Sequence, residues 1–574
     1  MLANILTGFQ TLAMLTPPSA AEYLALIPGS IVAIVAMIVI LVDTFHRPGT
    51  RRDYLAYISA IGLGLAGLSA YLLWDNTVDG TTFHGMLYLD RFALFFVFIA
   101  CLSGGLAMLQ TPPFMKFSRM DRGEFYMLVL FSVSGAIFMA NAADLLTIFI
   151  ALEIMSIPVY CLAGYMRRDP RGAESSMKYF ILGAFSAGLM LYGMSMIYGI
   201  TGTTNLEHIG TGLNRIVTPI MQNGVMSVPE AAQDAGLLLT VAILLILSGF
   251  AFKIAAVPFH IWTPDVYTGS PSPAVGFMAT TVKAGAFAAM IRVFMIAFES
   301  SQLKGGFFGI GWIDVFFFLA AASMVLGNVV AIMQTNVKRM LAYSSIAHAG
   351  YLLLGFVAAG SDVKFFLHND TVLFYLLTYT TGTVGAFGVL SILGRKGRTV
   401  ETYEDLTGLG LKYPFAGLMM GIFMFSSAGV PPTAGFVGKF YIFSSAVQVG
   451  NATGEFSFIG LAILAVLTSV AGAYYYLKVL VCMYMREESE PGKFEMAQDS
   501  GAKFALVVAA VLTLWLGVAP GAAIQTAREA VVDFGGASPA LQQTLDDGAK
   551  QLEQMEQRSR AAEQTPPPSD EPLG

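Results

Sequence analysis

Charged side chains are scarce in this sequence of 574 residues, because Asp, Glu, Lys and Arg together make up only 12%. A soluble domain carries about 25% of such residues, so this chain has too few to cover a water-exposed surface. Hydrophobic residues make up 56% of the sequence. This composition excludes a cytosolic enzyme, a nucleic-acid-binding protein and a disordered chain, and it predicts that most of the protein lies in a lipid bilayer.

Cysteine is equally scarce. The three cysteines, Cys101, Cys161 and Cys482, lie far apart in apolar runs. The sequence has no Cys-x-x-Cys pair and no Cys/His cluster, which argues against a zinc or iron–sulfur site. The first apolar stretch follows no basic segment and is long enough to span a membrane, so we expect no cleaved signal peptide.

Fourteen apolar runs are long enough to cross a bilayer, which takes about 20 helical residues. The run at 413–449 is too long for one crossing and contains Pro431-Pro432, so we expect one discontinuous helix there. The sequence therefore predicts an all-α integral membrane protein. The predicted spans are 24–44, 54–74, 86–109, 123–140, 143–165, 175–200, 236–258, 272–298, 311–334, 340–359, 371–394, 413–449, 457–485 and 504–523.

Two predicted spans are interrupted by proline in opposite order. In the seventh span Lys253 precedes Pro258, whereas in the twelfth span Lys439 follows Pro431-Pro432. Five spans separate these breaks, so an inverted repeat of five helices is expected, an arrangement typical of transport proteins. The predicted regions are 1–122 (helices 1–3), 123–298 (first repeat, helices 4–8), 299–485 (second repeat, helices 9–13), 486–534 (the last helix) and 535–574 (a polar tail outside the membrane).

The loops differ in charge on the two sides of the predicted membrane. Basic loops tend to stay in the cytoplasm, so we expect both termini on the periplasmic side of a bacterial inner membrane. The loops after even-numbered spans hold only Arg215, Lys304 and Lys364. The loops after odd-numbered spans hold Arg47, Arg51, Arg52, Lys116, Arg119, Arg122, Arg167, Arg168, Arg171, Lys338, Arg339, Arg395, Lys396, Arg398, Lys412, Arg486 and Lys493.

Several ionisable residues lie within the apolar runs, where charge is unfavourable. Each intramembrane Lys or Glu costs about 2.5–3.5 kcal/mol, so the four most central ones cost roughly 10–14 kcal/mol together. That sum equals the net stability of a typical domain, and a purely structural role does not explain it. The alternative to a functional role is a structural ion pair, or a long side chain whose charge reaches the membrane–water interface. This alternative applies most to Lys178, which lies near a helix end. The candidate residues are Glu153, Lys253, Lys283 and Lys439, followed by Lys178, His260 and His348.

Lysine suits proton transfer for a physical reason. A lysine exchanges protons near neutrality only when its surroundings disfavour the ammonium by roughly 4–5 kcal/mol, and burial in an apolar bundle supplies an energy of that order. A nearby carboxylate favours the ammonium, so moving a Glu–Lys pair together or apart would switch the lysine between holding and releasing its proton. Arginine stays charged, while histidine titrates near neutrality and suits a relay.

Several long motifs resemble the N-subunit family of respiratory complex I, one of the antiporter-like membrane subunits of proton-translocating NADH-quinone oxidoreductase. The resemblance extends from about residue 24 to 523. It lies in Leu152-Glu-Ile-Met-Ser-Ile-Pro158, Lys178-Tyr-Phe-Ile-Leu-Gly-Ala-Phe185, Phe252-Lys-Ile-Ala-Ala-Val-Pro-Phe-His-Ile-Trp-Thr-Pro-Asp-Val-Tyr-Thr-Gly-Ser-Pro-Ser-Pro273, Val337-Lys-Arg-Met-Leu-Ala-Tyr-Ser-Ser-Ile-Ala-His348 and Gly429-Val-Pro-Pro-Thr-Ala-Gly-Phe-Val-Gly-Lys-Phe440.

The resemblance implies fourteen helices with two inverted five-helix repeats and discontinuous seventh and twelfth helices. It also implies residue roles. Glu153 resembles the fifth-helix carboxylate that pairs with the seventh-helix lysine, Lys253. Lys283 resembles the eighth-helix lysine of a central hydrophilic axis, with His260 between it and Lys253, and Lys439 resembles the twelfth-helix lysine of the outward half.

We therefore expect a membrane subunit that couples quinone reduction in other subunits to proton translocation through a Glu/Lys/His relay. Neighbouring membrane subunits of complex I and lipid are its expected partners, with no nucleic acid. We expect no cofactor in this chain, because no site for NADH, flavin, an iron–sulfur cluster or quinone is identified. Two alternatives stay open: a subunit of a Mrp-type sodium/proton antiporter or a membrane-bound hydrogenase, and a scaffold with locked ion pairs.

Overall fold

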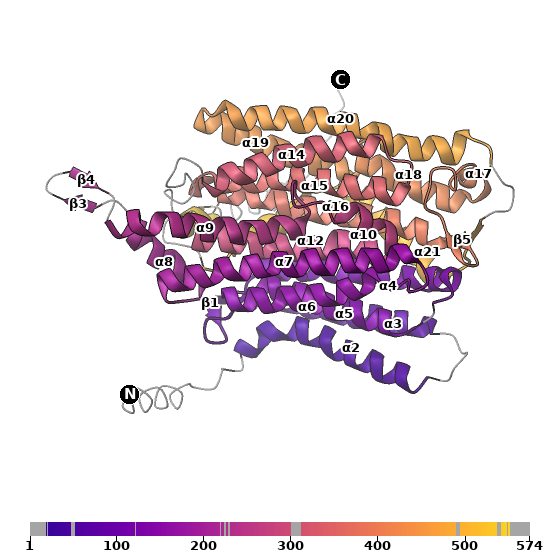
Figure 1. Ribbon diagram of the computed structural model, residues 1–574, viewed down its shortest axis with the longest axis horizontal. Coiled ribbons are helices and arrows are strands. Elements are labelled where there is room, and N and C mark those ends of the chain that lie inside the picture. The colour runs from indigo at the N-terminus through magenta and orange to yellow at the C-terminus, as the bar shows by residue number, and fades with distance from the viewer. Residues whose placement is uncertain are drawn as a thin grey trace, which may run out of the picture.

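Membrane-length helices dominate the computed structural model, which describes residues 19, 21–46, 52–120, 122–217, 220–222, 225–227, 230–299, 311–488, 494–536, 541–547 and 549–550. The helices run side by side along the molecule (Figure 1). Within these described residues, thirteen helices are long and apolar enough to cross a membrane. They are η1–α2 (Glu22–Thr44), α3 (Asp53–Leu73), α4 (Arg91–Ser118), α5 (Glu124–Asn141), α6 (Leu145–Ala163), α7 (Pro170–Thr201), α9 (Glu230–Ile254), α11 to η3 (Ser272–Ala297), α14 (Trp312–Ile332), α15 (Val337–Gly360), η4–α16 (Val363–Ile392), α20 (Phe456–Met485) and α21 (Ser500–Val518).

The discontinuous helix predicted at 413–449 is present as two pieces. These are α18 (Pro414–Ala428) and α19 (Ala434–Thr453), with residues 429–433 between them. Gly429 ends α18 with a φ of +85°, a conformation that glycine adopts without strain. With this pair, the predicted all-α membrane fold is confirmed.

The seventh span is also broken where proline predicts it. α9 ends at Ile254, and the chain resumes as the short helix α10 (Thr263–Gly269). The Val257–Pro258 and Pro431–Pro432 peptides are both cis. Lys253 lies before its break and Lys439 after its own, as the inverted order requires. The proposed limits of the repeats stay a prediction.

The third span differs from its predicted range of 86–109. Residues Leu87–Leu89 form strand β2, and α4 begins at Arg91 and continues through Pro112 and Pro113 to Ser118. The prediction ended the helix before these prolines. Proline is tolerated in a membrane helix where neighbouring helices surround it, and both Pro112 and Pro113 are buried.

Short elements lie at the two ends of the helix bundle. They are β1 (Val78–Thr82), β2 (Leu87–Leu89), α8 (Leu206–Val217), β3 (Ile220–Gln222), β4 (Val225–Ser227), β5 (Leu393–Arg395), β6 (Arg398–Thr399), α17 (Leu409–Lys412), β7 (Glu495–Met496) and α22 (Gly521–Val532). Strand β5 pairs antiparallel with β6 and β7, and β1 pairs antiparallel with β2.

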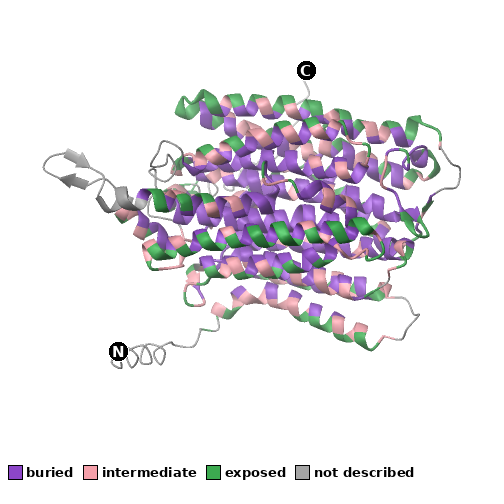
Figure 2. Ribbon diagram, viewed as in Figure 1, coloured by how far each residue is buried: buried purple, intermediate pink, exposed green. Residues whose placement is uncertain are grey.

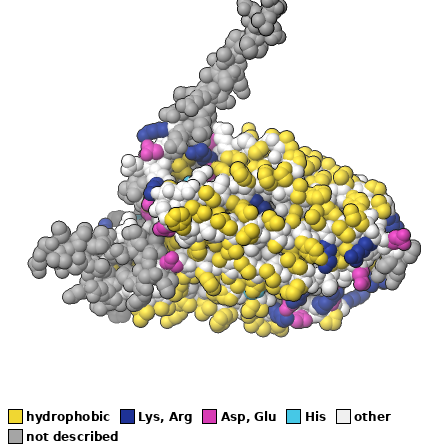
Figure 3. Space-filling model, turned by 90° about the horizontal axis from the view of Figure 1, so that it is seen from above, with side chains coloured by type: hydrophobic (Ala, Val, Ile, Leu, Met, Phe, Trp, Pro, Cys, Tyr) yellow, Lys and Arg dark blue, Asp and Glu magenta, His cyan; other side chains and the backbone are white. Residues whose placement is uncertain are grey.

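Contacts between loops bring three of the predicted basic loops together at one end of the bundle. The Gly397 amide donates to the carbonyl of Phe117 at 2.7 Å, and Arg171 forms an ion pair with Glu401. These contacts join the C-terminal ends of α4 and α16 and the N-terminal end of α7, and we call this end of the bundle the basic end. On the face seen in Figure 3, Lys and Arg gather at this end beside a broad hydrophobic surface. The other end of the bundle is called the opposite end below. Arg47, Arg51, Lys304 and Lys493 lie outside the described residues.

The centre of the bundle consists mainly of buried residues (Figure 2). Helices α15 and α16 are buried along almost their whole length, whereas α2 and α20 form opposite edges and expose apolar side chains. Small residues allow this packing. A Cβ atom at Gly327 of α14 would lie 2.6 Å from the Ala347 nitrogen of α15, so only glycine permits this approach of the two backbones.

The chain after the last span packs onto the opposite end. Helix α22 contacts α4 and α16, and the Phe534 ring lies 4.9 Å from Phe92 and 4.8 Å from Phe366. Residues 541–547 are helical, with Leu541 and Leu545 buried. The described start of the predicted polar tail is therefore attached to the bundle, and residues 551–574 lie outside the described part.

Candidate functional site

Lys253 is buried just before the break in the seventh span, with 3% of its surface exposed. Its Nζ donates to the Ser156 hydroxyl at 2.7 Å and to the Tyr160 hydroxyl at 2.8 Å, both on α6. Its ammonium also lies 5.2 Å from the centre of the Tyr160 ring. These contacts stabilise the positive charge without a carboxylate, since hydrogen bonds to a charged group contribute about 1.5–3 kcal/mol each.

Glu153 does not form the expected ion pair with Lys253. Within the described residues its carboxylate has no cation within 4.0 Å, and its buried Oε1 has no hydrogen-bond partner. Ser156 follows three residues later on α6, and three residues place two side chains on neighbouring turns of the same helix face. The structure therefore brings Glu153 to the lysine's side of α6 but leaves the pair apart.

His260 lies in the break between α9 and α10 and is partly buried. Its Nδ1 is buried and has no hydrogen-bond partner within the described residues. Within these residues no hydrogen bond joins His260 to Lys253 or Lys283. Its expected position between the two lysines therefore stays a prediction.

Lys283 is buried in the eighth span, with 2% of its surface exposed. Its Nζ donates to the Ser345 carbonyl at 2.7 Å and to the Ser345 hydroxyl at 2.9 Å. Tyr379 of α16 donates to the same hydroxyl at 2.9 Å. A π-helical turn, η2 (Met278–Val282), immediately precedes α12 (Lys283–Arg292), and π-helical turns are frequent at functional sites.

His348 follows one turn after Ser345 on α15 and is 6% exposed. Its Nδ1 shares a 2.7 Å hydrogen bond with Tyr375, and its Nε2 shares a 3.1 Å hydrogen bond with Tyr476. Its ring centre lies 4.9 Å from that of Tyr379. Three helices thus hold this imidazole among hydroxyl groups.

Lys439 closes the end of the half-helix α18. Its Nζ donates to the Ser427 carbonyl at 2.7 Å, the Ala428 carbonyl at 3.3 Å and the Ser469 hydroxyl at 2.9 Å. The last carbonyls of a helix have no partner within that helix and carry partial negative charge, so a cation is stabilised there. The break in the twelfth span therefore creates the acceptor site that holds Lys439.

The side chains from Lys283 to Lys439 form one series of contacts through the middle of the bundle. The Tyr351 ring bridges its second half, because it lies 5.6 Å from the His348 ring and 5.6 Å from the Lys439 ammonium. We call this series the buried polar chain, and it consists of Lys283, Ser345, Tyr379, His348, Tyr351 and Lys439. Within the described residues no hydrogen bond joins Lys253 to it.

Lys178 lies apart from these buried groups. It forms ion pairs with Glu174 at 2.5 Å and with Asp265 at 2.7 Å, and 40% of its side chain is exposed. Asp265 also pairs with Arg339 at 2.7 Å. The structure therefore places Lys178 in an exposed ion cluster between α7, α10 and α15.

The prediction from sequence missed two buried cations. Arg292 forms a buried ion pair with Asp90, with Nη2–carboxylate distances of 2.7 and 2.9 Å. Lys338, assigned from sequence to a loop, is buried and donates to the Ser270 carbonyl at 2.6 Å at the end of α10. Arg292 lies inside a predicted span, so the argument used for the lysines would have found it.

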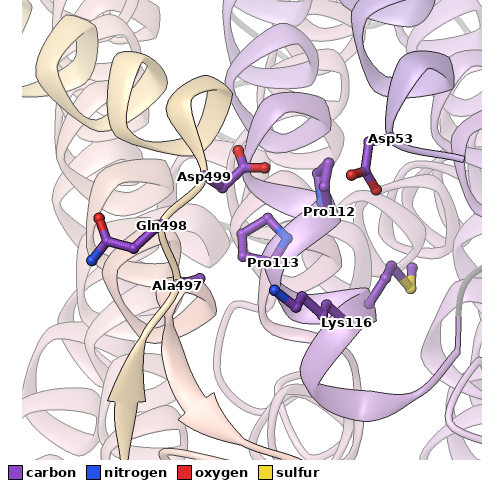
Figure 4. Close-up of a pocket in the computed structure, with 8 residues that line it drawn as sticks. Asp53, Pro112, Pro113, Lys116, Ala497, Gln498 and Asp499 are labelled. Carbon is purple, nitrogen blue, oxygen red and sulfur yellow. The ribbon is translucent and has the colours of Figure 1, made fainter. Parts of the chain in front are cut away.

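A separate small pocket lies at the basic end, with a volume of about 140 Å³ (Figure 4). Asp53, Lys116 and Asp499 bring charges to its wall. Asp499 also accepts the Ala502 amide at 2.8 Å and so begins α21. No residue of the buried polar chain lines this pocket, which is therefore not part of the candidate site.

Comparisons with known proteins identify the family. The family model described as "NADH:quinone oxidoreductase/Mrp antiporter, TM" matches residues 142–468. NADH-quinone oxidoreductase subunit N of Trichlorobacter lovleyi is 43% identical, covering 88% of this chain and 96% of the relative. Subunit N 1 of Sorangium cellulosum is 42% identical, covering 89% and 98%.

A solved structure agrees with these relatives. A chain of respiratory complex I from Thermus thermophilus with bound aureothin is 33% identical, with a TM-score of 0.67, and the match covers 87% of this chain and 98% of that chain. These matches therefore include nearly all of the membrane helices described above. The chain belongs to the NADH-quinone oxidoreductase subunit N family.

Proposed function

We propose that this chain is a proton-translocating membrane subunit of NADH-quinone oxidoreductase. Quinone reduction in other subunits drives it, and Glu153, Lys253, His260, Lys283, His348 and Lys439 carry the protons. Lys178 belongs to the ion cluster at the basic end, beside the seventh-span break. In this proposal the chain holds no cofactor and the redox chemistry takes place in partner subunits.

The observation that carries the proposal is the way in which the buried ammonium groups are held. Lys253, Lys283 and Lys439 are each 6% exposed or less, and each donates to hydroxyl or carbonyl oxygens. No carboxylate lies within 4.0 Å of any of them in the described part of the chain. A locked ion pair keeps its proton, whereas hydroxyl and carbonyl acceptors leave the lysine free to lose one.

The proposed cycle is electrostatic and begins at Glu153. When the Glu153 carboxylate approaches Lys253, it stabilises the ammonium, and when it moves away, the lysine releases its proton toward Lys283. The described arrangement corresponds to the separated state. The proton then passes along the buried polar chain to Lys439.

The membrane orientation is part of the same proposal. Because basic loops stay in the cytoplasm, we place the basic end in the cytoplasm and the opposite end, with both termini, in the periplasm of a bacterial inner membrane. Neighbouring membrane subunits of the complex contact the apolar edges at α2 and α20, with lipid covering the remaining surface.

Substitution of the buried lysines tests the proposal. We expect complexes carrying Lys253→Ala or Lys283→Ala to assemble but to lose most proton uptake and quinone-coupled turnover in liposomes. Lys503→Ala is the matched control, because Lys503 lies at the surface of the basic end. Lys283→Arg should also fail, since arginine does not release its proton. Normal pumping by Lys253→Ala and Lys283→Ala would overturn the proposal.

A second function is supported by the family description, which also names Mrp antiporters. In that case the same lysines would exchange protons for sodium. The two functions are separated by measuring sodium-dependent proton exchange in everted vesicles without NADH. The scaffold alternative requires locked ion pairs at the central lysines, which the described contacts of Lys253, Lys283 and Lys439 do not contain.

A further inference from the structure

A second polar region lies at the opposite end, outside the buried polar chain. It is a cavity of about 420 Å³ between η4 (Val363–His368), α16, α19 and α22. Asp370, Tyr441 and Ser445 line it, together with the cationic groups of Lys364 and Arg528. Few apolar side chains reach its wall, so water is a suitable occupant.

Asp370 is the buried carboxylate of this cavity, with 5% of its surface exposed. The Tyr441 hydroxyl donates to its Oδ2 at 2.6 Å. Within the described residues no Lys, Arg or His nitrogen lies within 4.0 Å of it. Asp90 differs, because Arg292 holds it in a bidentate ion pair. Asp370 is therefore not fixed in the charged state by a direct ion pair.

The two helices that hold Asp370 also hold the last groups of the buried polar chain. On α16, Tyr375 follows Asp370 by five residues, a rise of about 7.5 Å along the helix, and its hydroxyl bonds to His348. On α19, Tyr441 follows Lys439 by two residues. Helices α16 and α19 therefore carry both Asp370 at the cavity and the groups of the His348–Lys439 part of the buried polar chain.

An apolar residue separates Lys439 from the cavity on the buried face of α19. Lys439, Ile442 and Ser445 are all buried and follow one another along this face. The Ser445 hydroxyl lines the cavity and has no partner within the described residues. Ile442 has no group that can carry a proton from Lys439 to Ser445 on this face, whereas the Asp370 carboxylate lies on the neighbouring helix α16.

We propose that Asp370 is a proton-exchange site that connects the Lys439 end of the buried polar chain to solvent through this cavity. Water relays the proton between them, so that an N–H bond of Lys439 breaks as an O–H bond forms on Asp370. Asp370 then gives the proton to water in the cavity, and the buried polar chain supplies Lys439 with its next proton. The groups facing Asp370 are Tyr441 of α19, His368 and Lys364 of η4, and Arg528 of α22. This inference rests on the proposed proton translocation.

The test uses the whole complex in liposomes, with NADH oxidation and proton uptake measured together. We expect Asp370→Asn to assemble and to lose proton uptake severalfold, and Asp370→Glu to restore it. Asp362→Asn is the matched control, because Asp362 lies in the same loop region but is exposed and paired with Lys364. Normal proton uptake by Asp370→Asn would overturn the inference.

A second variant keeps the inference testable if Asp370→Asn fails to assemble. Tyr441→Phe retains the carboxylate but removes its hydrogen-bond donor, so the pH profile of proton uptake should shift to higher pH. An unchanged profile would overturn the inference. Lys283→Ala separates this inference from the proposed function. If Lys283→Ala and Asp370→Asn both pump normally, the relay itself is wrong. If Lys283→Ala is defective while Asp370→Asn pumps normally, only the role of Asp370 is wrong.

Discussion

The ammonium of Lys253 donates a 2.8 Å hydrogen bond to the hydroxyl of Tyr160, two turns along α6 from Glu153. The Tyr160 hydroxyl therefore accepts a hydrogen bond from Lys253, the role that was expected of the Glu153 carboxylate. A neutral acceptor stabilises the ammonium less than a carboxylate does, which makes the charge of Lys253 sensitive to small movements of α6 against α9.

Tyr160→Phe should shift the pH dependence of pumping toward lower pH. The substitution removes one of two hydrogen bonds to the ammonium, which contributes about 1.5–3 kcal/mol and corresponds to a shift of about one to two pH units. The measurement is proton uptake by the reconstituted complex between pH 5 and pH 9, normalised at each pH to the rate of NADH oxidation.

Tyr192→Phe provides the control for this prediction. Tyr192 lies on α7 and is 61% exposed, so its hydroxyl should not influence Lys253. A pH profile of Tyr160→Phe that matches both the wild type and this control would show that the hydroxyl does not set the charge of Lys253.

Gly429→Ala should lower both stability and pumping. Gly429 has a φ of +85°, which costs a residue with a Cβ about 1–2 kcal/mol, and the added methyl would lie 3.1 Å from Cδ of Lys439. Gly421→Ala is the matched control, because it lies inside α18 with open space around its Cβ position. We expect a lower melting temperature of the purified complex for Gly429→Ala only, and equal melting of the two variants would contradict this.

The buried pair of Arg292 and Asp90 should behave as a structural unit. Asp90→Asn leaves the Arg292 charge without its carboxylate partner, which should destabilise the protein by about 3–5 kcal/mol. Arg292→Met combined with Asp90→Asn should be less destabilising than the two single changes added together. Asp75→Asn, at an 85% exposed ion-pair partner of Arg91, should change stability by about 0–1 kcal/mol. Additive effects in denaturant unfolding would argue against a coupled pair.

The sequence was sufficient to predict the spans and the central lysines, because each depends on local composition. A span is a run of apolar residues of sufficient length, and a lysine inside such a run is conspicuous by its cost. The breaks at Pro258 and Pro431-Pro432 were predictable for the same reason.

The acceptors of these lysines were not predictable in this way. The chain has 23 tyrosines, and nothing in the sequence distinguishes Tyr160 or Tyr379 from the tyrosines that face lipid. Their selection depends on which helix faces pack together. Asp370 was overlooked because it directly precedes the predicted span at 371–394, whereas Arg292 was overlooked although it lies inside a predicted span. The packing of Phe534 was not foreseen because its segment is polar overall.

Asp533 should make attachment of the C-terminal segment pH-dependent. Burial raises the pKa of this carboxyl to about 6 from an ordinary value of 3.8, beside Asp90 and Arg91, and its Oδ2 accepts the Arg91 amide at 2.8 Å. Because the folded state binds this proton more tightly than the unfolded state, the stabilisation is complete below about pH 4 and is lost as the pH rises through about 6. Asp533→Asn should therefore reduce the loss of melting temperature of the purified complex between pH 4.5 and pH 7, whereas Asp362→Asn, at an exposed carboxylate, should leave that loss unchanged. If Asp533→Asn melted with the pH dependence of the wild type, the half-buried Asp533 carboxyl would not be the group that controls this attachment.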